Sequence, residues 1–374
     1  MNAENSLKTK IYISRRSKLT FAYFFAMLGL IILNVCFNVI PNNMSDNNID
    51  TAFTLLSQIL CMGIVPFAIA TALTKKKDES VLSSMKSLAI DFGYTKNLKW
   101  KQWLILIPLA VSFYLLTKLM SMITVLVLTG TRYQLPITSP TIYKGPLDLI
   151  KWIALTALLP AIFEEFSHRG LALNAMKDRG SEATQVFLSA LLFALMHTNI
   201  LQMFYAFVGG CVFGYLAMRS KSIYAGMFLH FANNALATIE DYSSQYPDGA
   251  FGFLARLGDF WSKSNFTLLL RIVVLLVNLF VFVLLIAAFV KQCEPRKAIR
   301  GVNLLGNRAK QKIVLNPDGT YVKQEDAKSS KIELDIDLYR PDGKPTLLDN
   351  VMLFATIAMC GLSTIFTYIW GLLR

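Results

Sequence analysis

Long apolar runs separated by polar segments dominate the chain. About nine of them approach or exceed the ~20 apolar residues that a helix needs to cross a bilayer. They span 19–40, 51–74, 103–129, 148–178, 183–199, 201–218, 222–240, 266–290 and 348–372. The run at 148–178 is predicted to lie only partly in lipid, and 183–218 could instead form a short hairpin. The pattern predicts an all-α polytopic membrane protein with about eight to nine transmembrane helices.

The segments between the runs differ in charge, and this difference predicts orientation. Loop 41–50 contains no Lys or Arg, whereas 75–102 contains seven lysines and 292–347 is dense in both residues. Loop 241–265 is nearly balanced in charge. Because basic loops stay on the cytosolic side, we expect a cytosolic N-terminus and an external C-terminus. The protein is then a multi-pass integral membrane protein, of the plasma membrane if its host is bacterial.

Two stretches outside the apolar runs carry their own patterns. Val81 to Phe92 is amphipathic at helical spacing and is either a helix on the inner membrane surface or an ordinary linker helix. In 292–347, Ile332, Leu334 and Ile336 alternate with polar residues, and Asn316-Pro317-Asp318-Gly319 is a turn signal. This segment is predicted to be a small β-rich cytosolic insert before the last helix.

Composition narrows the class further. The chain has 374 residues, of which 54% are hydrophobic and 16% are charged. A soluble domain of this size would carry more charge. The net charge of +13 indicates basic loops that face anionic lipid, and no aromatic–basic interleaving suggests nucleic-acid binding. The bilayer is the predicted partner, and nucleic acid is not.

Two adjacent carboxylates interrupt one of the apolar runs. Glu164 and Glu165 follow Leu155 to Phe163, which is apolar apart from Thr156. An ionisable residue at such depth is costly and marks a candidate functional site. Glu165 and Arg169 are at i,i+4 and can pair on one helix face. Glu164 has no basic partner at helical spacing and could act as a general base. Alternatively, the three charges mark the cytosolic end of a helix.

The chain has only three histidines, and two of them lie in later apolar runs. His197 is at i,i+4 from Phe193, and Asn234 is at i,i+4 from His230. Counted from the basic end of each helix, Glu164, His197, His230 and Asn234 all lie roughly 14 to 22 Å deep. They could therefore meet in one cavity near the middle of the bilayer, although a single membrane histidine more often serves helix packing.

The residue types suggest a hydrolase without a covalent nucleophile. Glu164 with His197 could bind and deprotonate a water, and His230 with Asn234 could stabilise an oxyanion. Pro160 removes one backbone hydrogen bond and leaves the carbonyl of Thr156 free.

The sequence resembles the CAAX prenyl protease 2 and bacteriocin-processing family (CPBP, Abi) of intramembrane glutamate proteases. The resemblance covers roughly 150–240 and rests on three motifs in order, which are Glu164-Glu165-x-x-x-Arg169, Phe193-x-x-x-His197 and His230-x-x-x-Asn234. It implies a metal-independent endopeptidase that uses no cofactor and cleaves a membrane-associated or lipidated peptide or protein.

The resemblance also implies roles for single residues. It makes Glu164 and His197 the groups that activate water, and His230 and Asn234 the oxyanion site. The supporting residues that it implies are Glu165, Arg169 and Phe193. His168 stands where the family usually has an apolar residue. We predict that His168 is a surface histidine on the cytosolic side or else a fourth site group.

Two other functions stay open. Two histidines and a carboxylate can hold zinc, although no His-Glu-x-x-His is present. A non-catalytic scaffold, immunity protein or transporter could use the same buried polar groups.

The predicted domain organisation has five parts. They are the N-terminal helices and amphipathic loop (1–147), the catalytic core (148–240), a further transmembrane helix (241–291), the β-rich insert (292–347) and the last helix (348–374).

Overall fold

The computed structural model describes residues 15–38, 46–135, 141–177, 179–263, 268–293, 313–315, 321–323, 333–334 and 345–373. The chain divides into two compact units. One comprises Met1–Cys293 and Pro345–Arg374, and the other comprises Glu294–Lys344.

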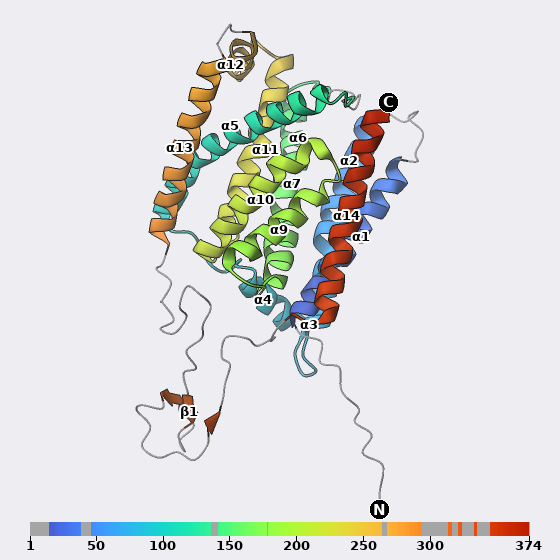
Figure 1. The fold of residues 1–374 in the computed structure, drawn as a ribbon, viewed down its shortest axis with the longest axis vertical. Coiled ribbons are helices and arrows are strands. Elements are labelled where there is room, and N and C mark those ends of the chain that lie inside the picture. The colour runs from blue at the N-terminus through green and yellow to red at the C-terminus, as the bar shows by residue number, and fades with distance from the viewer. Residues whose placement is uncertain are drawn as a thin grey trace, which may run out of the picture. The chain divides into compact units, whose positions relative to one another are not determined.

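The first unit is helical in its described residues (Figure 1). Its elements are α1 (Arg15–Asn38), α2 (Asp46–Leu55), η1 (Leu56–Ile64), α3 (Val65–Thr74), α4 (Val81–Asp91), α5 (Trp100–Gly130), α6 (Pro146–Ile153), η2 (Ala154–Leu158), α7 (Leu159–Glu165), η3 (Phe166–Ala172), α8 (Leu173–Ala175), α9 (Glu182–Met196), α10 (Ile200–Ser220), α11 (Tyr224–Gln245), α12 (Gly252–Lys263), α13 (Leu268–Gln292) and α14 (Leu347–Leu373). Each predicted run coincides with a helix or with consecutive helical segments. Helix α12 lies where we expected a loop.

Seven helical stretches of the described chain are long and apolar enough to cross a membrane. This confirms an all-α, multi-pass integral membrane protein. Two of the predicted spans do not meet that standard. Helix α9 has 15 residues, which is roughly 22 Å and shorter than a ~30 Å hydrocarbon layer. Helix α11 is long enough but carries Glu240, Asp241 and the polar site residues.

The π-helical segments η1, η2 and η3 interrupt two of the predicted spans. Pro66 follows η1 in the first turn of α3, and Pro160 follows η2 in the first turn of α7. A proline cannot donate to the carbonyl four residues earlier, so Met62 and Thr156 each lose their usual helical donor. Such local widening is frequent at functional sites.

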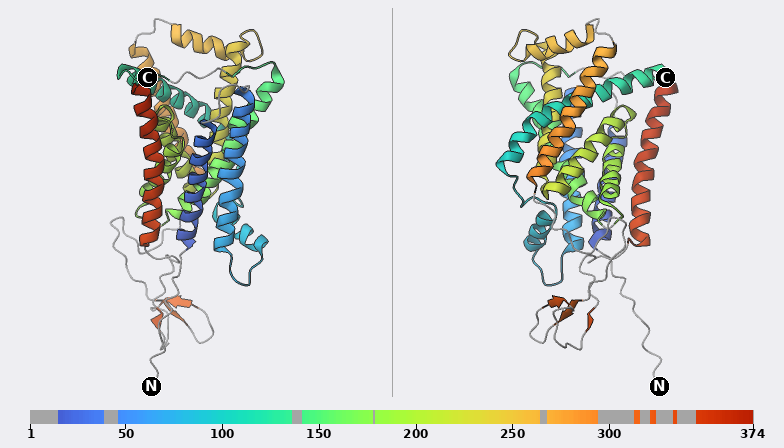
Figure 2. Two further views of the ribbon diagram at one scale, coloured as in Figure 1. Left: turned by 90° about the vertical axis from the view of Figure 1, so that its right-hand side faces the viewer. Right: turned by 60° about the vertical axis from the view of Figure 1, so that its left-hand side comes forward.

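The helices pack closely around the middle of this unit. Helix α1 packs against α3 and α14, α9 against α10, and α5 against α13 (Figure 2). Gly210 on α10 allows the α9 contact, because a Cβ there would lie 2.8 Å from the Cα of Ala190. Helix α13 exposes most of its apolar side chains, as expected of a helix that faces lipid.

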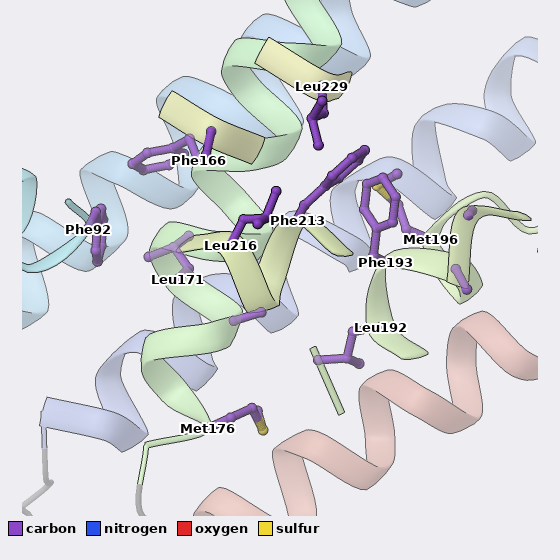
Figure 3. Packing of buried hydrophobic residues seen from close by; sticks show 14 of the residues in the cluster. Phe92, Phe166, Leu171, Met176, Leu192, Phe193, Met196, Phe213, Leu216 and Leu229 are labelled. Carbon is purple, nitrogen blue, oxygen red and sulfur yellow. The ribbon is translucent and has the colours of Figure 1, made fainter. Parts of the chain in front are cut away.

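Buried aromatic and aliphatic side chains join these helices (Figure 3). Phe166 packs on Phe92 from the end of α4, with ring centroids 5.6 Å apart. Phe193 on α9 and Phe213 on α10 have ring centroids 6.3 Å apart in this core, and both line the cavity described below. The core therefore supplies a rigid apolar wall beside the candidate site.

The second unit contains three short strands within its described residues. They are β1 (Ile313–Leu315), β2 (Tyr321–Lys323) and β3 (Glu333–Leu334), in the antiparallel order β2-β1-β3. Val314 pairs with Val322 in this register. Most of 292–347 lies outside the described residues, so the β-rich character of the insert and its cytosolic side stay predictions.

Candidate active site

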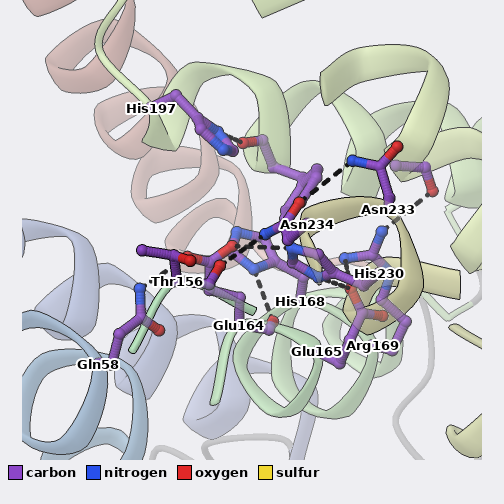
Figure 4. A network of polar contacts seen from close by, with 12 residues as sticks. Gln58, Thr156, Glu164, Glu165, His168, Arg169, His197, His230, Asn233 and Asn234 are labelled. Atoms are coloured by element: carbon purple, nitrogen blue, oxygen red, sulfur yellow. Dashed lines mark hydrogen bonds and ion pairs between the residues drawn. The ribbon is translucent and has the colours of Figure 1, made fainter. Parts of the chain in front are cut away.

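One cavity of about 350 Å³ lies among α5, η2, α7, α10 and α11 and the end of α9. Its lining residues are Phe113, Thr117, Thr156, Pro160, Glu164, Phe193, His197, Gln202, Tyr205, Ala206, Gly209, Phe213, His230, Asn233, Asn234 and Thr238. All four residues predicted to carry the chemistry are among them. The lining combines aromatic rings with amide, hydroxyl, imidazole and carboxylate groups, and Figure 4 shows several of these polar groups.

Glu165, Arg169 and His230 form a buried polar cluster, and His230 also lines the cavity. Arg169 Nη1 lies 3.1 Å from Glu165 Oε1, which confirms the predicted i,i+4 pair. His230 Nδ1 lies 3.0 Å from the same oxygen. An ionised carboxylate only accepts hydrogen bonds, so Nδ1 carries the proton. Glu165 thereby fixes the tautomer and orientation of the His230 ring.

Two phenylalanines hold this cluster in place. The Arg169 guanidinium lies over Phe193 at 4.6 Å and over Phe213 at 5.1 Å. The His230 ring stacks on Phe213 at 5.4 Å and meets the edge of Phe193 at 5.7 Å. Phe193 also contacts the ring of His197 at 5.2 Å. Phe193, which the motif predicted, therefore contacts Arg169, His197 and His230. Phe213 was not predicted.

Glu164 has a different environment from its neighbour. Its side chain is buried, and Oε2 lies 3.8 Å from His230 Nε2, too far for a direct hydrogen bond. Oε1 accepts a hydrogen bond of 2.7 Å from Gln58 Nε2 on η1. Gln58 was missed by the motif search. The signal that could have found it is an amide inside the apolar run 51–74.

His197 lies at the end of α9, where the chain turns toward α10. Its Nδ1 donates a hydrogen bond of 2.9 Å to the carbonyl of Phe193. In the neutral ring, Nε2 is then an unprotonated acceptor at the cavity. Thr198 follows with a φ of 48°, and Asn199 caps α10 by accepting from the Leu201 N–H. This tight turn sets where the imidazole projects.

Asn234 belongs to a chain of polar contacts across three elements. Its Nδ2 donates to the Thr156 carbonyl at 3.0 Å, which is the group that Pro160 leaves without a helical donor. Its Oδ1 accepts from Asn233 Nδ2 at 3.1 Å, and Asn233 Oδ1 accepts from Thr117 Oγ1 at 2.7 Å. These bonds fix the amide orientation and leave the second N–H of Asn234 for another acceptor. Thr117 and Asn233 were not predicted.

The prediction that His168 lies on the surface is wrong. The residue is 0% exposed, and its ring packs between Tyr23 and Phe193. Its Nδ1 donates 2.8 Å to the backbone carbonyl of Glu164. The i,i+4 spacing to Glu164 places it inside the helix packing, where the aromatic rings of α1 and α9 cover it. His168 thus supports the backbone of Glu164 and does not line the cavity.

Candidate metal ligands are dispersed in the described part of the chain. No cluster of three or more His, Cys, Asp or Glu residues among the described positions has an arrangement that could hold a metal ion. The zinc alternative therefore draws its support from residue types and not from a ligand cluster in that part of the chain.

The comparisons with known proteins agree with the motif analysis. Residues 146–236 match the model of a family described as type II CAAX prenyl endopeptidase Rce1-like. The match confirms the predicted family resemblance for this segment and supports a function of the intramembrane CAAX-protease type. No curated protein and no solved structure matches the chain.

Proposed function

We propose that the chain is a metal-independent glutamate endopeptidase that hydrolyses a peptide bond of a membrane-associated or lipidated substrate. The observation that carries this proposal is the convergence of Glu164, His197, His230 and Asn234 on one cavity. These groups come from three motifs that lie far apart in sequence, and a carboxylate, two imidazoles and an amide suffice for water activation and charge stabilisation. The Rce1-like match over the same segment supports it.

In this mechanism, a water lies between Glu164 Oε2 and His197 Nε2. Both atoms accept hydrogen bonds, so they orient the two O–H groups of the water and leave its lone pair for the scissile carbonyl carbon. Glu164 takes one proton as the C–O bond forms. When the C–N bond breaks, the same proton passes to the leaving amine, so the glutamate returns to its charged form.

The oxyanion is stabilised by His230 and Asn234. Glu165 accepts from His230 Nδ1 and fixes the ring, and the proposed mechanism uses this ring with a proton on Nε2 as well. That Nε2–H and the second N–H of Asn234 are the two proposed donors. Because both side chains are already fixed by hydrogen bonds, they need little reorganisation during the reaction.

The cavity suits a short extended stretch of peptide. Its volume of about 350 Å³ holds a few residues at most. Phe113, Tyr205 and Phe213 offer apolar contact to side chains or to an attached lipid. The cytosolic N-terminus remains a prediction from the loop charges, and the plasma membrane is the predicted location only if the host is bacterial.

Comparative proteomics of peptide termini tests the proposal. Cells would carry the parent chain, Glu164→Gln or Glu79→Gln, a control outside the cavity. We expect a set of new termini that is present with the parent and the control and absent with Glu164→Gln. Identical termini in all three would contradict hydrolysis and favour a scaffold, immunity or transport role. Loss of cleavage on chelation would favour the zinc alternative.

A further inference from the structure

We propose that Gln58 is a positioning residue for the reaction, and that it holds the Glu164 carboxylate so that Oε2 is the oxygen that takes the proton from water. This inference rests on the proposed function. Gln58 lies on η1, outside the segment 146–236 that matches the family. It names a requirement for catalysis in a part of the chain to which the motifs assign no role.

The contact itself is unambiguous in its chemistry. Gln58 Nε2 lies 2.7 Å from Glu164 Oε1, and the two residues are 106 positions apart in sequence. An ionised carboxylate cannot donate, so the amide must present its N–H₂ group to it. Oε1 is therefore occupied, whereas Oε2 faces His230 Nε2 at 3.8 Å (Figure 4). In this proposal Oε1 anchors the carboxylate, and Oε2 accepts the proton from water.

Two further contacts fix how η1 packs beside this hydrogen bond. A Cβ at Gly63 would lie 2.6 Å from Phe163 Cδ1, so only glycine allows η1 to approach α7 this closely. Ser167 Oγ donates 2.7 Å to the Met62 carbonyl, which Pro66 leaves without its helical donor. Because π-helical bonding runs from i to i+5, Gln58, Met62 and Gly63 share the face of η1 that meets α7. The amide is thus aimed by the helix packing.

Glu164 has an amide as its hydrogen-bond donor, whereas the neighbouring Glu165 has a guanidinium. Glu165 is paired with the guanidinium of Arg169, and a carboxylate neutralised in this way is a poor base. Gln58 gives Glu164 a hydrogen bond to the charged form without supplying a positive charge. The hydrogen bond therefore orients the Glu164 carboxylate without placing a further positive charge beside it. The same logic predicts that a cation at position 58 would suppress activity.

A merely structural role would give a different result from positioning. A polar contact between membrane helices can also serve assembly alone. In that case any replacement that keeps the fold would keep the rate and its pH dependence. A positioning role requires a hydrogen-bond donor next to Oε1, and Gln58→Glu offers one only while the introduced carboxyl is protonated. The pH dependence of that variant is therefore diagnostic.

The test uses the full-length protein in membranes and a peptide whose new terminus depends on Glu164. Four variants are compared with the parent from pH 5 to pH 9, namely Gln58→Leu, Gln58→Glu, Glu164→Gln and the control Gln185→Leu. Gln185 lies on α9 and bonds to the Gly180 carbonyl, away from the cavity. We expect Gln58→Leu to lower kcat on the order of 100-fold at every pH, with a smaller change in KM. Gln58→Glu should regain activity as the pH falls, and Gln185→Leu should match the parent.

Two outcomes overturn the inference while leaving the proposed function in place. One is a Gln58→Leu protein with the parental kcat and pH profile beside an inactive Glu164→Gln. The other is a Gln58→Glu protein that is inactive at every pH although it keeps the parental unfolding temperature. If Glu164→Gln cleaves as the parent does, the proposed function fails and this inference fails with it.

Discussion

At the scale of single residues, Glu164 and Glu165 have different partners and different proposed roles. Glu165 is 0% exposed, forms an ion pair with Arg169 and accepts a hydrogen bond from His230 Nδ1. Glu164 contacts an amide and lines the cavity. The sequence indicated this division through the i,i+4 spacing of Glu165 and Arg169. It could not indicate Gln58, because that contact depends on how two distant helices pack.

The two acids should therefore respond differently to the same substitution. Glu165→Gln leaves a buried guanidinium without its counter-charge, which costs about 3 to 5 kcal/mol. Glu164 has its direct hydrogen bond from an amide, and His230 Nε2 lies 3.8 Å away, so Glu164→Gln should cost less stability than Glu165→Gln while cleavage stops. Thermal unfolding of the two purified variants measures this contrast. Equal unfolding temperatures would contradict the assignment of the ion pair.

The chain from Thr117 to Asn234 makes a second prediction at this scale. Thr117→Val removes the donor to Asn233 and loosens the amide of Asn234, at a cost of about 1 kcal/mol, or roughly a fivefold fall in kcat. Thr124→Val on the same helix is the matched control, because the Thr124 hydroxyl donates to the carbonyl of Met120 within its own helix. Equal kcat values for the two variants would show that the chain does not orient Asn234.

At the scale of elements, the two prolines that follow π-helical segments act in the same way. Pro160 frees the Thr156 carbonyl for Asn234, and Pro66 frees the Met62 carbonyl for Ser167. Each freed carbonyl then joins two helices. The sequence predicted the free Thr156 carbonyl from Pro160, but not its partner. The apolar runs gave the helices, whereas the interruptions by η1, η2 and η3 are a tertiary effect that hydrophobic periodicity does not record.

Pro160→Ala tests this use of proline. The alanine N–H restores a helical donor to the Thr156 carbonyl, which then competes with Asn234 for the same acceptor. We expect an unchanged or higher unfolding temperature together with a lower kcat. Pro108→Ala in α5 is the control, because Pro108 is also inside a span but does not line the cavity. A parental kcat for Pro160→Ala would show that catalysis does not depend on a proline at this position.

At the scale of the whole molecule, helices outside the family segment complete the site. Helix α5 supplies Phe113 and Thr117 to the cavity, and η1 supplies Gln58 to Glu164. Helix α14 reaches the turn after His197, where the Thr367 hydroxyl is shared between the Thr198 carbonyl at 3.0 Å and the Thr364 carbonyl of its own helix at 2.8 Å. Motif order therefore located the proposed site residues, but part of the wall around them comes from helices outside the matched segment.

The contact from α14 predicts that the last helix steadies His197. Thr367→Val removes the hydroxyl and should lower kcat several-fold, with a loss of about 1 kcal/mol of transition-state stabilisation. Ser363→Ala is the control, because the Ser363 hydroxyl bonds to the carbonyl of Met359 within its own helix. A kcat for Thr367→Val equal to that of the control would mean that α14 is only a neighbour of the turn.

The most direct test of the central claim is the cleavage rate of the purified full-length chain in lipid vesicles, measured with and without a metal chelator. The claim is that the Glu164 carboxylate deprotonates the attacking water. It predicts that the parent cleaves its substrate equally well in both conditions and that Glu164→Gln is slower by roughly 10² to 10⁴. A Glu164→Gln rate equal to the parental one, or a parental rate abolished by the chelator, would contradict it.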